Sequence, residues 1–314
     1  MDSGSGEGMM GARRDGGERM REAVRYRIQH TSHYSYSSPV RSSAMTLCFK
    51  PREDGGQSVL GFEMKTDPSI PLTWETDCFG NARHFLITHH PHDSLEITAV
   101  SSVERSPGAG EPEPLAGEAW AEIEGWRDSV EHWHFTHPSK FARPSAELSA
   151  FISEHGLENP AGDPLSALID LSDRLCRGFE YVPGSTSAVS QIEDILETRK
   201  GVCQDYAHVM ISIARSWGVP TRYVSGYLYV EDDEGQPIPA EAGHAWVECR
   251  LPGIGWLGFD PTNNRLVGEQ HVRVAVGRDY EDVAPTRGIF RGARDTGLEV
   301  EVRMETLDQF CQTG

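Results

Sequence analysis

The hydrophobic period of this sequence changes at a stretch rich in proline and glycine, residues 106–116 (SPGAGEPEPLA). Upstream of it, apolar and polar residues alternate, as in the run that begins with Val24, Tyr26 and Ile28, which is typical of half-buried β-strands. Downstream, apolar residues recur at helical spacing. The stretch itself cannot continue a sheet, because proline lacks a ladder donor and glycine costs backbone entropy. We therefore expect a linker over 106–116.

We expect the chain to have five parts, of which this linker is the third. Residues 1–20 are rich in glycine and charge, and we expect a disordered tail there, with a short C-terminal tail over 306–314. Strand-like runs separated by turn sequences such as Asp54-Gly55-Gly56 predict an N-terminal antiparallel β-domain over 21–105, most simply a sandwich. Residues 117–305 contain first helical and then strand-like runs, which predicts an α+β core.

Charge and composition exclude several classes of function. The formal net charge is −19, from 48 acidic and 29 basic residues, and such a surface repels phosphate backbones and anionic lipid headgroups. We therefore expect no nucleic-acid or membrane partner. No apolar run is long enough for a membrane span, and the six cysteines are far apart without a CxxC pair. We expect reduced thiols and a cytoplasmic location; oligomeric state is left open.

A segment that is apolar on nearly every side follows Cys203 and is stopped by Gly218 and Pro220. A helix of this kind belongs inside a domain, and Cys203 stands at its first residue. The unpaired amides and the positive dipole end of a helix favour a thiolate, and the same amides can bind an oxyanion. Position alone does not separate a nucleophile from an inert buried thiol.

Two further residues fit a catalytic role for Cys203. His244 heads a strand-like run, and Asp260 ends the next run after the turn Pro252-Gly253-Ile254-Gly255. Neighbouring antiparallel strands would bring His244 and Asp260 together at one edge of a sheet. A Cys-His-Asp triad results, in which histidine helps to form the thiolate and aspartate orients the ring. The alternatives are a satisfied core histidine and a turn carboxylate before Pro261.

These segments resemble the bacterial transglutaminase-like family, whose core shares its plan with papain-like cysteine proteases. The resemblance is carried by GVCQDYAHVMISIARSWGVPTRYVSGYL around Cys203, by GHAWVECRLPGIGWLGFDPTN from His244 to Asp260, by FEYVPGST, and by the N-terminal YRIQHTSHYSYSSPV. It implies a papain/transglutaminase-like cysteine-proteinase core preceded by an antiparallel β-sandwich domain. It also implies Cys203 as nucleophile, His244 as base and acid, and Asp260 as orienting group.

The triad predicts a reaction type without its acceptor. We expect a thiol-dependent amide or peptide hydrolase, or an acyl transferase, that works through a cysteine acyl-enzyme on a peptide or amide substrate. Water as acceptor is favoured over a primary amine. The alternative is a catalytically inactive peptide- or protein-binding module on the same fold. No cofactor is expected.

Three supporting residues are less constrained by the sequence. Tyr181 lies in a segment where the family resemblance implies an aromatic oxyanion donor, although packing explains it equally well. Gln204 could orient its neighbour Cys203 or simply satisfy first-turn amides. Trp246 could wall a substrate channel or pack in the sheet. Two histidine runs, His89 to His92 and His132 to His137, lack zinc-site spacing, so we expect no metal.

Overall fold

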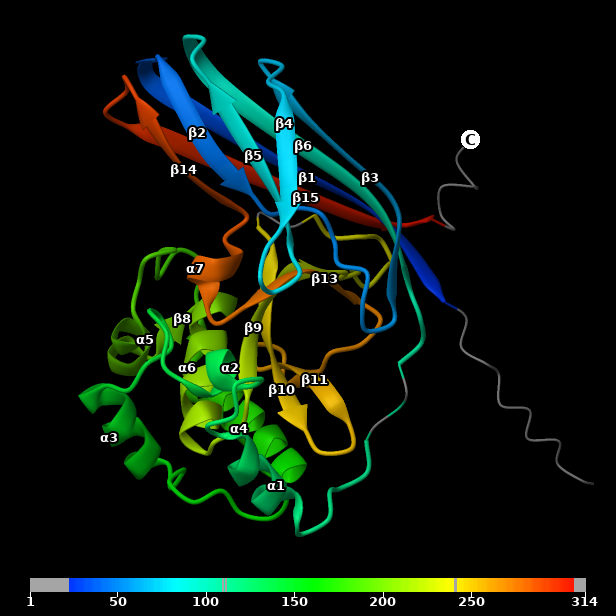
Figure 1. Ribbon diagram of the computed structural model, residues 1–314, viewed down its shortest axis with the longest axis vertical. Helices are drawn as coiled ribbons and strands as arrows, with labels where there is room; N and C mark the ends of the chain where they lie inside the picture. Colours follow the sequence, from blue (N-terminus) through cyan, green and yellow to red (C-terminus); the bar gives the residue numbers. More distant parts are fainter. Residues whose placement is uncertain (1–22, 109, 111, 240–241, 308–314) are drawn as a thin grey trace, which may run out of the picture.

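The computed structural model describes residues 23–108, 110, 112–239 and 242–307. The expected disordered tail over 1–20 and most of the expected C-terminal tail lie outside these residues. The described chain forms two parts, a β-sandwich and a mixed helix-and-sheet unit below it (Figure 1). The expected α+β class with an antiparallel sandwich is confirmed.

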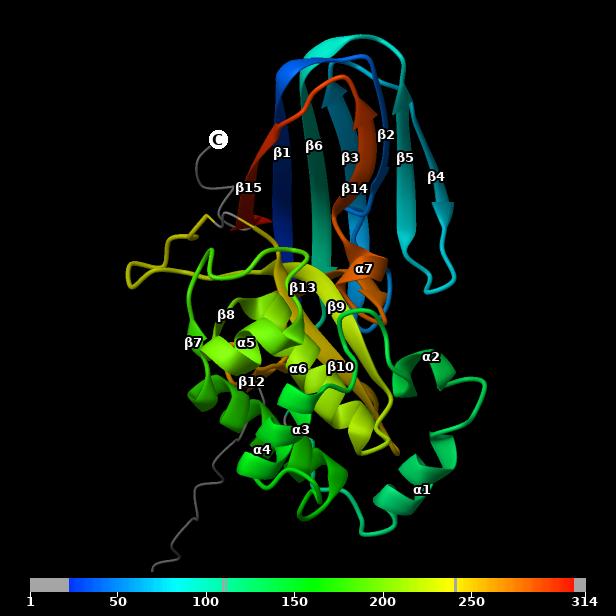
Figure 2. The same cartoon turned by 90° about the vertical axis from the view of Figure 1, so that its left-hand side faces the viewer.

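Two four-stranded antiparallel sheets make up the sandwich and face each other (Figure 2). One sheet has the order β15-β1-β6-β3, and the other has the order β14-β2-β5-β4. The strands of the N-terminal region are β1 (Val24–Val40), β2 (Ser42–Leu47), β3 (Gln57–Asp67), β4 (Leu72–Thr76), β5 (Ala82–Thr88) and β6 (His92–Arg105).

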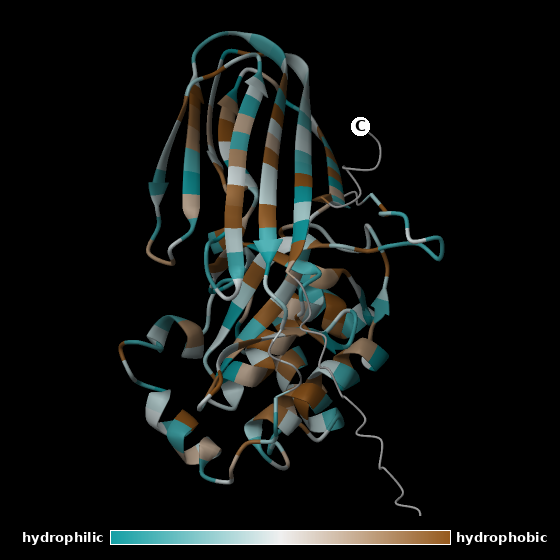
Figure 3. Cartoon of the chain, turned by 90° about the vertical axis from the view of Figure 1, so that its right-hand side faces the viewer, coloured by the Kyte–Doolittle hydropathy of each residue, from teal (hydrophilic) through white to brown (hydrophobic). Residues whose placement is uncertain are grey.

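Alternation of apolar and polar residues explains the sandwich. In β6, residues from Leu95 to Val103 are buried at every second position, because successive side chains of a strand point to opposite faces. Figure 3 shows the corresponding alternating bands along the long strands. The buried side chains between the two sheets are those of Leu47, Phe49, Ile70, Leu86, Leu95, Ile97 and Ala99.

The last two strands of the chain return to the sandwich. Strand β14 (Thr286–Arg291) pairs with β2, and β15 (Thr296–Thr306) pairs with β1 along its whole length. The sequence predicts an α+β core up to residue 305, whereas residues 286–291 and 296–306 pair with the N-terminal sheets. The reason is that each sheet offers an open edge, and strand pairing across distant sequence satisfies those edge groups.

Seven helices occur in the described part of the lower unit and its connections. They are α1 (Ala119–Trp126), α2 (Trp133–Thr136), α3 (Ala146–Glu154), α4 (Pro164–Gly178), α5 (Ile192–Thr198), α6 (Cys203–Ser216) and α7 (Tyr280–Val283). Ser145 and Asp163 cap α3 and α4 as their positions predict. Within the described chain, no helix has the length and apolar character needed to cross a membrane.

A five-stranded antiparallel sheet supports the helices. Its order is β12-β11-β10-β9-β13, from β9 (Thr221–Leu228), β10 (His244–Leu251), β11 (Gly255–Asp260), β12 (Arg265–Leu266) and β13 (His271–Gly277). Helix α6 packs against β9 and β10 and is buried along nearly its whole length. A two-stranded parallel ribbon of β7 (Glu180–Tyr181) and β8 (Lys200–Gly201) precedes α6. The helix therefore holds Cys203 at one end of the sheet.

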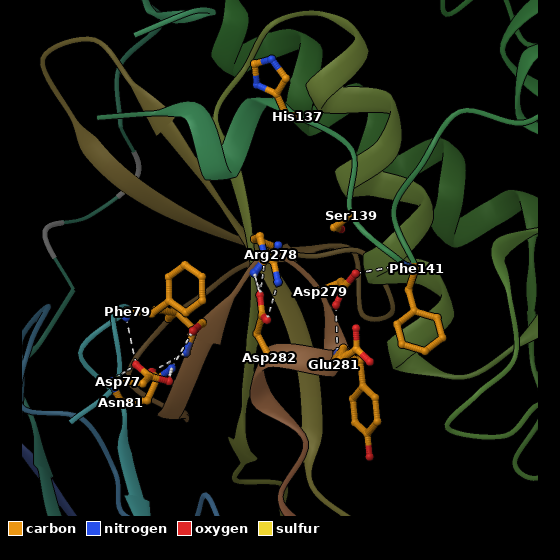
Figure 4. Close-up of polar contacts among 12 residues, drawn as sticks. Asp77, Phe79, Asn81, His137, Ser139, Phe141, Arg278, Asp279, Glu281 and Asp282 are labelled. Carbon is orange, nitrogen blue, oxygen red and sulfur yellow. Dashed lines mark hydrogen bonds and ion pairs between the residues drawn. The ribbon is translucent and has the colours of Figure 1, made fainter. Parts of the chain in front are cut away.

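Specific hydrogen bonds join the sandwich to the lower unit. The side chain of Asn81 bonds to the backbone of Val276 through both its oxygen and its nitrogen, at 2.9 and 2.8 Å. Asp77 accepts from Asn81 and Arg83, and Arg83 also donates to the backbone oxygen of Asp282. Figure 4 shows this turn beside the segment that follows β13. The sandwich is thus fixed to the strand that borders the site described next.

Candidate active site

Cys203 is the first residue of α6, where the sequence predicted it. Two backbone features hold the entry to this helix: Gly201 pairs with Tyr181 in the β7–β8 ribbon, and the Val202 amide donates to Asp205 Oδ2 at 2.8 Å. The Cys203 side chain is partly buried and contacts the main hydrophobic core. Amides in the first turn of a helix have no partner within the helix. The amide and the thiol of Cys203 are therefore both at the N-terminal end of α6.

The strand pairing of β10 with β11 brings His244 and Asp260 together. Val247 lies opposite Phe259 in the antiparallel register, so His244 and Asp260 stand at the same end of the hairpin. His244 Nε2 lies 2.8 Å from Asp260 Oδ2. The His244 ring keeps 13% of its side-chain surface exposed, whereas Asp260 is fully buried. A buried carboxylate therefore holds a ring that solvent or a substrate can still reach.

Burial and hydrogen bonding act in opposite directions on His244. Burial lowers the pKa of its ring, but hydrogen bonds to Asp260 and Cys203, together with their negative charges, outweigh it and raise the pKa to about 10. Since Nε2 faces Asp260, Nδ1 is the nitrogen left for Cys203. Burial raises the pKa of Asp260, but hydrogen bonds from His244, His271 and Asn263 hold that pKa well below its usual range. The arrangement favours a protonated His244 ring beside an ionised Asp260.

Asp260 is also bound by His271, a residue that the sequence analysis did not single out. His271 begins β13, is buried to 2% exposure, and places Nε2 3.2 Å from Asp260 Oδ2. Asn263 Nδ2 donates to the same oxygen at 2.7 Å, and the amides of Thr262 and Asn263 donate to Oδ1. The sequence signal for His271 is a histidine at the head of a strand-like run rich in valine and alanine.

Tyr181 and Gln204 lie near Cys203 in different ways. Tyr181 is half exposed and pairs in the β7–β8 ribbon with Gly201, two residues before Cys203. Burial, together with the charges of Cys203 and Asp260, raises the pKa of its hydroxyl. The Gln204 side chain is buried, and its Nε2 has no hydrogen-bond partner among the described residues. Tyr181 therefore carries a polar group that another molecule can reach, whereas the unpaired Gln204 nitrogen is enclosed within the protein.

Trp246 does not take the place that a substrate-binding residue would need. Its side chain has no exposed surface and packs with Val224, Val276 and Phe79. The proposed channel wall is therefore corrected to a packing role on the sheet, because a side chain without accessible surface cannot contact a substrate. Its ring edge lies against His271, with centroids 5.2 Å apart.

The segment after β13 is a hydrogen-bonded structural loop. Arg278 donates to both carboxylate oxygens of Asp282, and Asp279 caps α7 while accepting from the Phe141 amide (Figure 4). The Tyr280 amide donates to Nε2 of His208, a fully buried ring in α6 whose pKa burial lowers to about 3. The loop fixes α6 relative to β13.

Among the described residues, one group of side chains has the types and spacing of a metal site, and it consists of His244, Asp260 and His271. Their facing atoms are already engaged with one another through hydrogen bonds to Asp260 Oδ2. Hydrogen bonds therefore account for the close approach of these three side chains. A separate hollow of about 730 Å³ lies between α4 and residues 264–270, and neither Cys203 nor His244 lines it.

Two family models match this chain in the two parts seen in the structure. The transglutaminase-like superfamily model matches residues 154–261, which include Cys203, His244 and Asp260. The model of the bacterial transglutaminase-like N-terminal region matches residues 26–104, which form the sandwich strands β1 to β6. The matched ranges follow the structural division without including the returning strands β14 and β15.

Relatives extend the likeness over nearly the whole chain. An uncharacterized protein of Mycobacterium leprae is 31% identical over 285 residues, covering 90% of this chain and 99% of that protein. A Mycobacterium tuberculosis protein is 32% identical over 291 residues, covering 88% and 91%. A protein-glutamine gamma-glutamyltransferase of Pseudomonas aeruginosa is 37% identical over 89 residues, which are 27% of this chain and 13% of that enzyme.

The fold has a solved counterpart in a protein from Cytophaga hutchinsonii that is provisionally described as a cysteine protease. That structure matches with a TM-score of 0.71 at 20% identity and covers 92% of each chain. At this identity the likeness concerns the fold. Together with the family models and the mycobacterial relatives, it shows that the chain belongs to the bacterial transglutaminase-like family.

Proposed function

We propose that this protein is a thiol-dependent amide or peptide hydrolase, or a related acyl transferase, with Cys203, His244 and Asp260 as its catalytic triad. The observation that carries the proposal is the bonding of His244, whose ring is joined to both Cys203 and Asp260 and has a pKa raised to about 10. A ring that stays protonated beside a thiol at a helix start stabilises a thiolate. Family membership supports the same reaction class.

In the first half of the proposed reaction, the Cys203 thiolate attacks the carbonyl carbon of an amide and forms a C–S bond. His244 gives its proton to the leaving nitrogen as the C–N bond breaks, which releases an amine and leaves a thioester. Asp260 holds the ring in place and stabilises its charge. The amide of Cys203, together with the accessible Tyr181 hydroxyl, supplies donors for the oxyanion.

In the second half, neutral His244 accepts a proton from the acceptor as the acceptor attacks the thioester. The C–S bond breaks, the thiolate re-forms beside the imidazolium, and the acyl group leaves as an acid or as a new amide. We favour water as the acceptor and keep a primary amine as the second possibility. Peptide-like substrates and a cytoplasmic site of action remain predictions.

A library experiment tests the proposal directly. The protein is incubated with peptides and amides, with and without an added primary amine, and products and acylated Cys203 are identified by mass spectrometry. Hydrolysed products without amine indicate a hydrolase, and amine-linked products indicate a transferase. Cys203→Ala should abolish both, and full turnover in that variant would refute the mechanism.

Iodoacetamide separates an enzyme from an inactive binding module. An activated Cys203 should be modified near neutral pH well before the other cysteines. Cys48 and Cys249 provide internal references, because both are buried and burial raises the pKa of both thiols. Equal and slow labelling of Cys203 and the exposed Cys78 would favour the binding module.

A further inference from the structure

Three donors converge on a single oxygen of Asp260. His244 Nε2 lies at 2.8 Å, Asn263 Nδ2 at 2.7 Å and His271 Nε2 at 3.2 Å from Oδ2. The carboxylate has no exposed surface, so these contacts replace the water that would otherwise solvate it. His244 therefore shares its acceptor oxygen with two other groups.

The protonation state of His271 follows from its two neighbours. The Gly268 amide lies 3.3 Å from Nδ1 and can only donate, so Nδ1 carries a lone pair. The proton is then on Nε2, which faces the acceptor Asp260 Oδ2. Burial lowers the pKa of His271, and this effect outweighs the opposing hydrogen bond to Asp260. His271 is thus a neutral ring that donates one hydrogen bond to the carboxylate.

Among the described residues, the ion pairs of Asp260 are those with His244 and His271. The titratable or charged groups that act on Asp260, His244 or His271 come from α4, β7, α6 and β12, and they are Cys176, Tyr181, Cys203 and Arg265. Of these, Arg265 is the only cation, and its side chain donates to Gln270 at 3.0 Å. The hydrogen bonds made by Asp260 Oδ2 therefore affect the charge of His244 more directly than the charge of any other of these groups.

We propose that His271 is a positioning residue of the triad: its neutral Nε2–H fixes the Asp260 carboxylate and takes part of the charge on Oδ2 away from His244. This inference rests on the proposed function of the triad. A hydrogen bond to Oδ2 weakens the pull of that oxygen on the His244 proton. The imidazolium is then a better acid toward a leaving amine, while Asp260 stays ionised.

Two variants that differ by one methylene group test this role. His271→Gln places its amide near the position of Nε2 and keeps a donor for Asp260, whereas His271→Asn places its amide near Nδ1 and leaves Oδ2 without that donor. The matched control is His92→Gln, since His92 is a buried sandwich histidine that also makes two hydrogen bonds. The three proteins and the wild type are labelled with ¹⁵N-histidine and titrated by NMR.

The wild-type spectrum should show His271 as a neutral ring protonated at Nε2. The pKa of His244 should rise by about half a unit or more in His271→Asn, and should stay within about 0.2 units of wild type in His271→Gln and in the control. A ring protonated at Nδ1, or an unchanged or lowered His244 pKa in His271→Asn, overturns the proposal. If His271→Asn does not fold, the wild-type tautomer and the His271→Gln titration decide it.

The outcome is independent of whether Cys203 turns over a substrate. The NMR titration reads the hydrogen bonds of His271 and the proton of His244 directly. Turnover that survives in Cys203→Ala would remove the proposed function while leaving these titrations intact. Conversely, if the titrations contradict the proposal while Cys203 is acylated normally, only the role given to His271 is lost.

Discussion

Two buried carboxylates on adjacent strands of the same sheet are neutralised in different ways. Asp260, at the end of β11, is held by two histidines, an asparagine and two backbone amides. Glu248, in the middle of β10, is held by Arg222 at 2.6 Å and Arg273 at 3.1 Å. Both acids have almost no exposed surface. Their difference therefore comes from their partners and not from their burial.

The partners determine what each carboxylate can do. Arginine keeps its proton at any physiological pH, so the pair of arginines around Glu248 forms a fixed ion network. Arg273 also approaches Asp54 of the sandwich at 3.4 Å, which extends the network across the two parts of the molecule. Histidine can exchange its proton near neutral pH. The same buried charge thus belongs to a fixed ion network at Glu248, whereas at Asp260 it lies beside rings of the kind that can transfer a proton, as the proposed function requires.

The largest expected effect is on turnover in Asp260→Asn. The amide keeps the shape of the side chain but removes the charge that stabilises the His244 imidazolium, so we expect a loss of about a thousandfold or more. Turnover on the best substrate from the library measures it. Glu248→Gln is the matched variant, and its turnover at low temperature should stay near wild type. Equal losses in both variants would contradict the division of roles.

The second effect is on stability in Glu248→Gln. Removing Glu248 from this buried ion network leaves Arg222 without its carboxylate partner and Arg273 with only its longer contact to Asp54. We expect a loss of about 3 kcal/mol in the free energy of unfolding. Urea denaturation followed by tryptophan fluorescence measures it. The control is Glu104→Gln, which removes a partly exposed pair with Arg25 and should cost less than about 1 kcal/mol.

The third effect is a dependence of the unfolding free energy on pH. We expect it from the pair of Asp260 and His244 and not from Glu248, which is bound by arginines. The pKa of His244 is raised from 6.5 to about 10, so its contribution to stability is full below pH 6.5 and is lost as the pH rises through about 10. The pKa of Asp260 is lowered, so its contribution is present above its usual pKa and is lost as the pH falls below it. Unfolding free energies measured between pH 6 and 10.5 should fall in wild type and stay flatter in His244→Gln.

The smallest expected effect is that of Arg222→Lys. Lysine keeps the charge beside Glu248 but loses the planar contact with the Trp256 ring, which lies 4.2 Å from the guanidinium. We expect a loss of about 1 kcal/mol in stability and no change in the alkylation rate of Cys203. A change in that rate would show that the arginine network also reaches the proposed active site.

Local sequence patterns predict several structural elements of this protein. The apolar segment that starts at Cys203 forms helix α6, and the turn at 252–255 joins the strands that carry His244 and Asp260. These features are local, since helix burial and hairpin register depend on residues close together in the chain. The capping box at the start of α5, between Gln191 and Asp194, is local in the same sense.

The tertiary structure decided what depends on residues far apart in the sequence. Strands β14 and β15 join the sandwich although they follow the core, because open sheet edges select partners by geometry and not by order. Trp246 is enclosed by Phe79 of the sandwich, which no local pattern predicts. His271 meets Asp260 only because β13 crosses to the far edge of the sheet and its first residue still reaches the end of β11. The sequence thus specifies Cys203, His244 and Asp260 by their positions in local elements, and long-range packing determines the hydrogen bonds that set their charges.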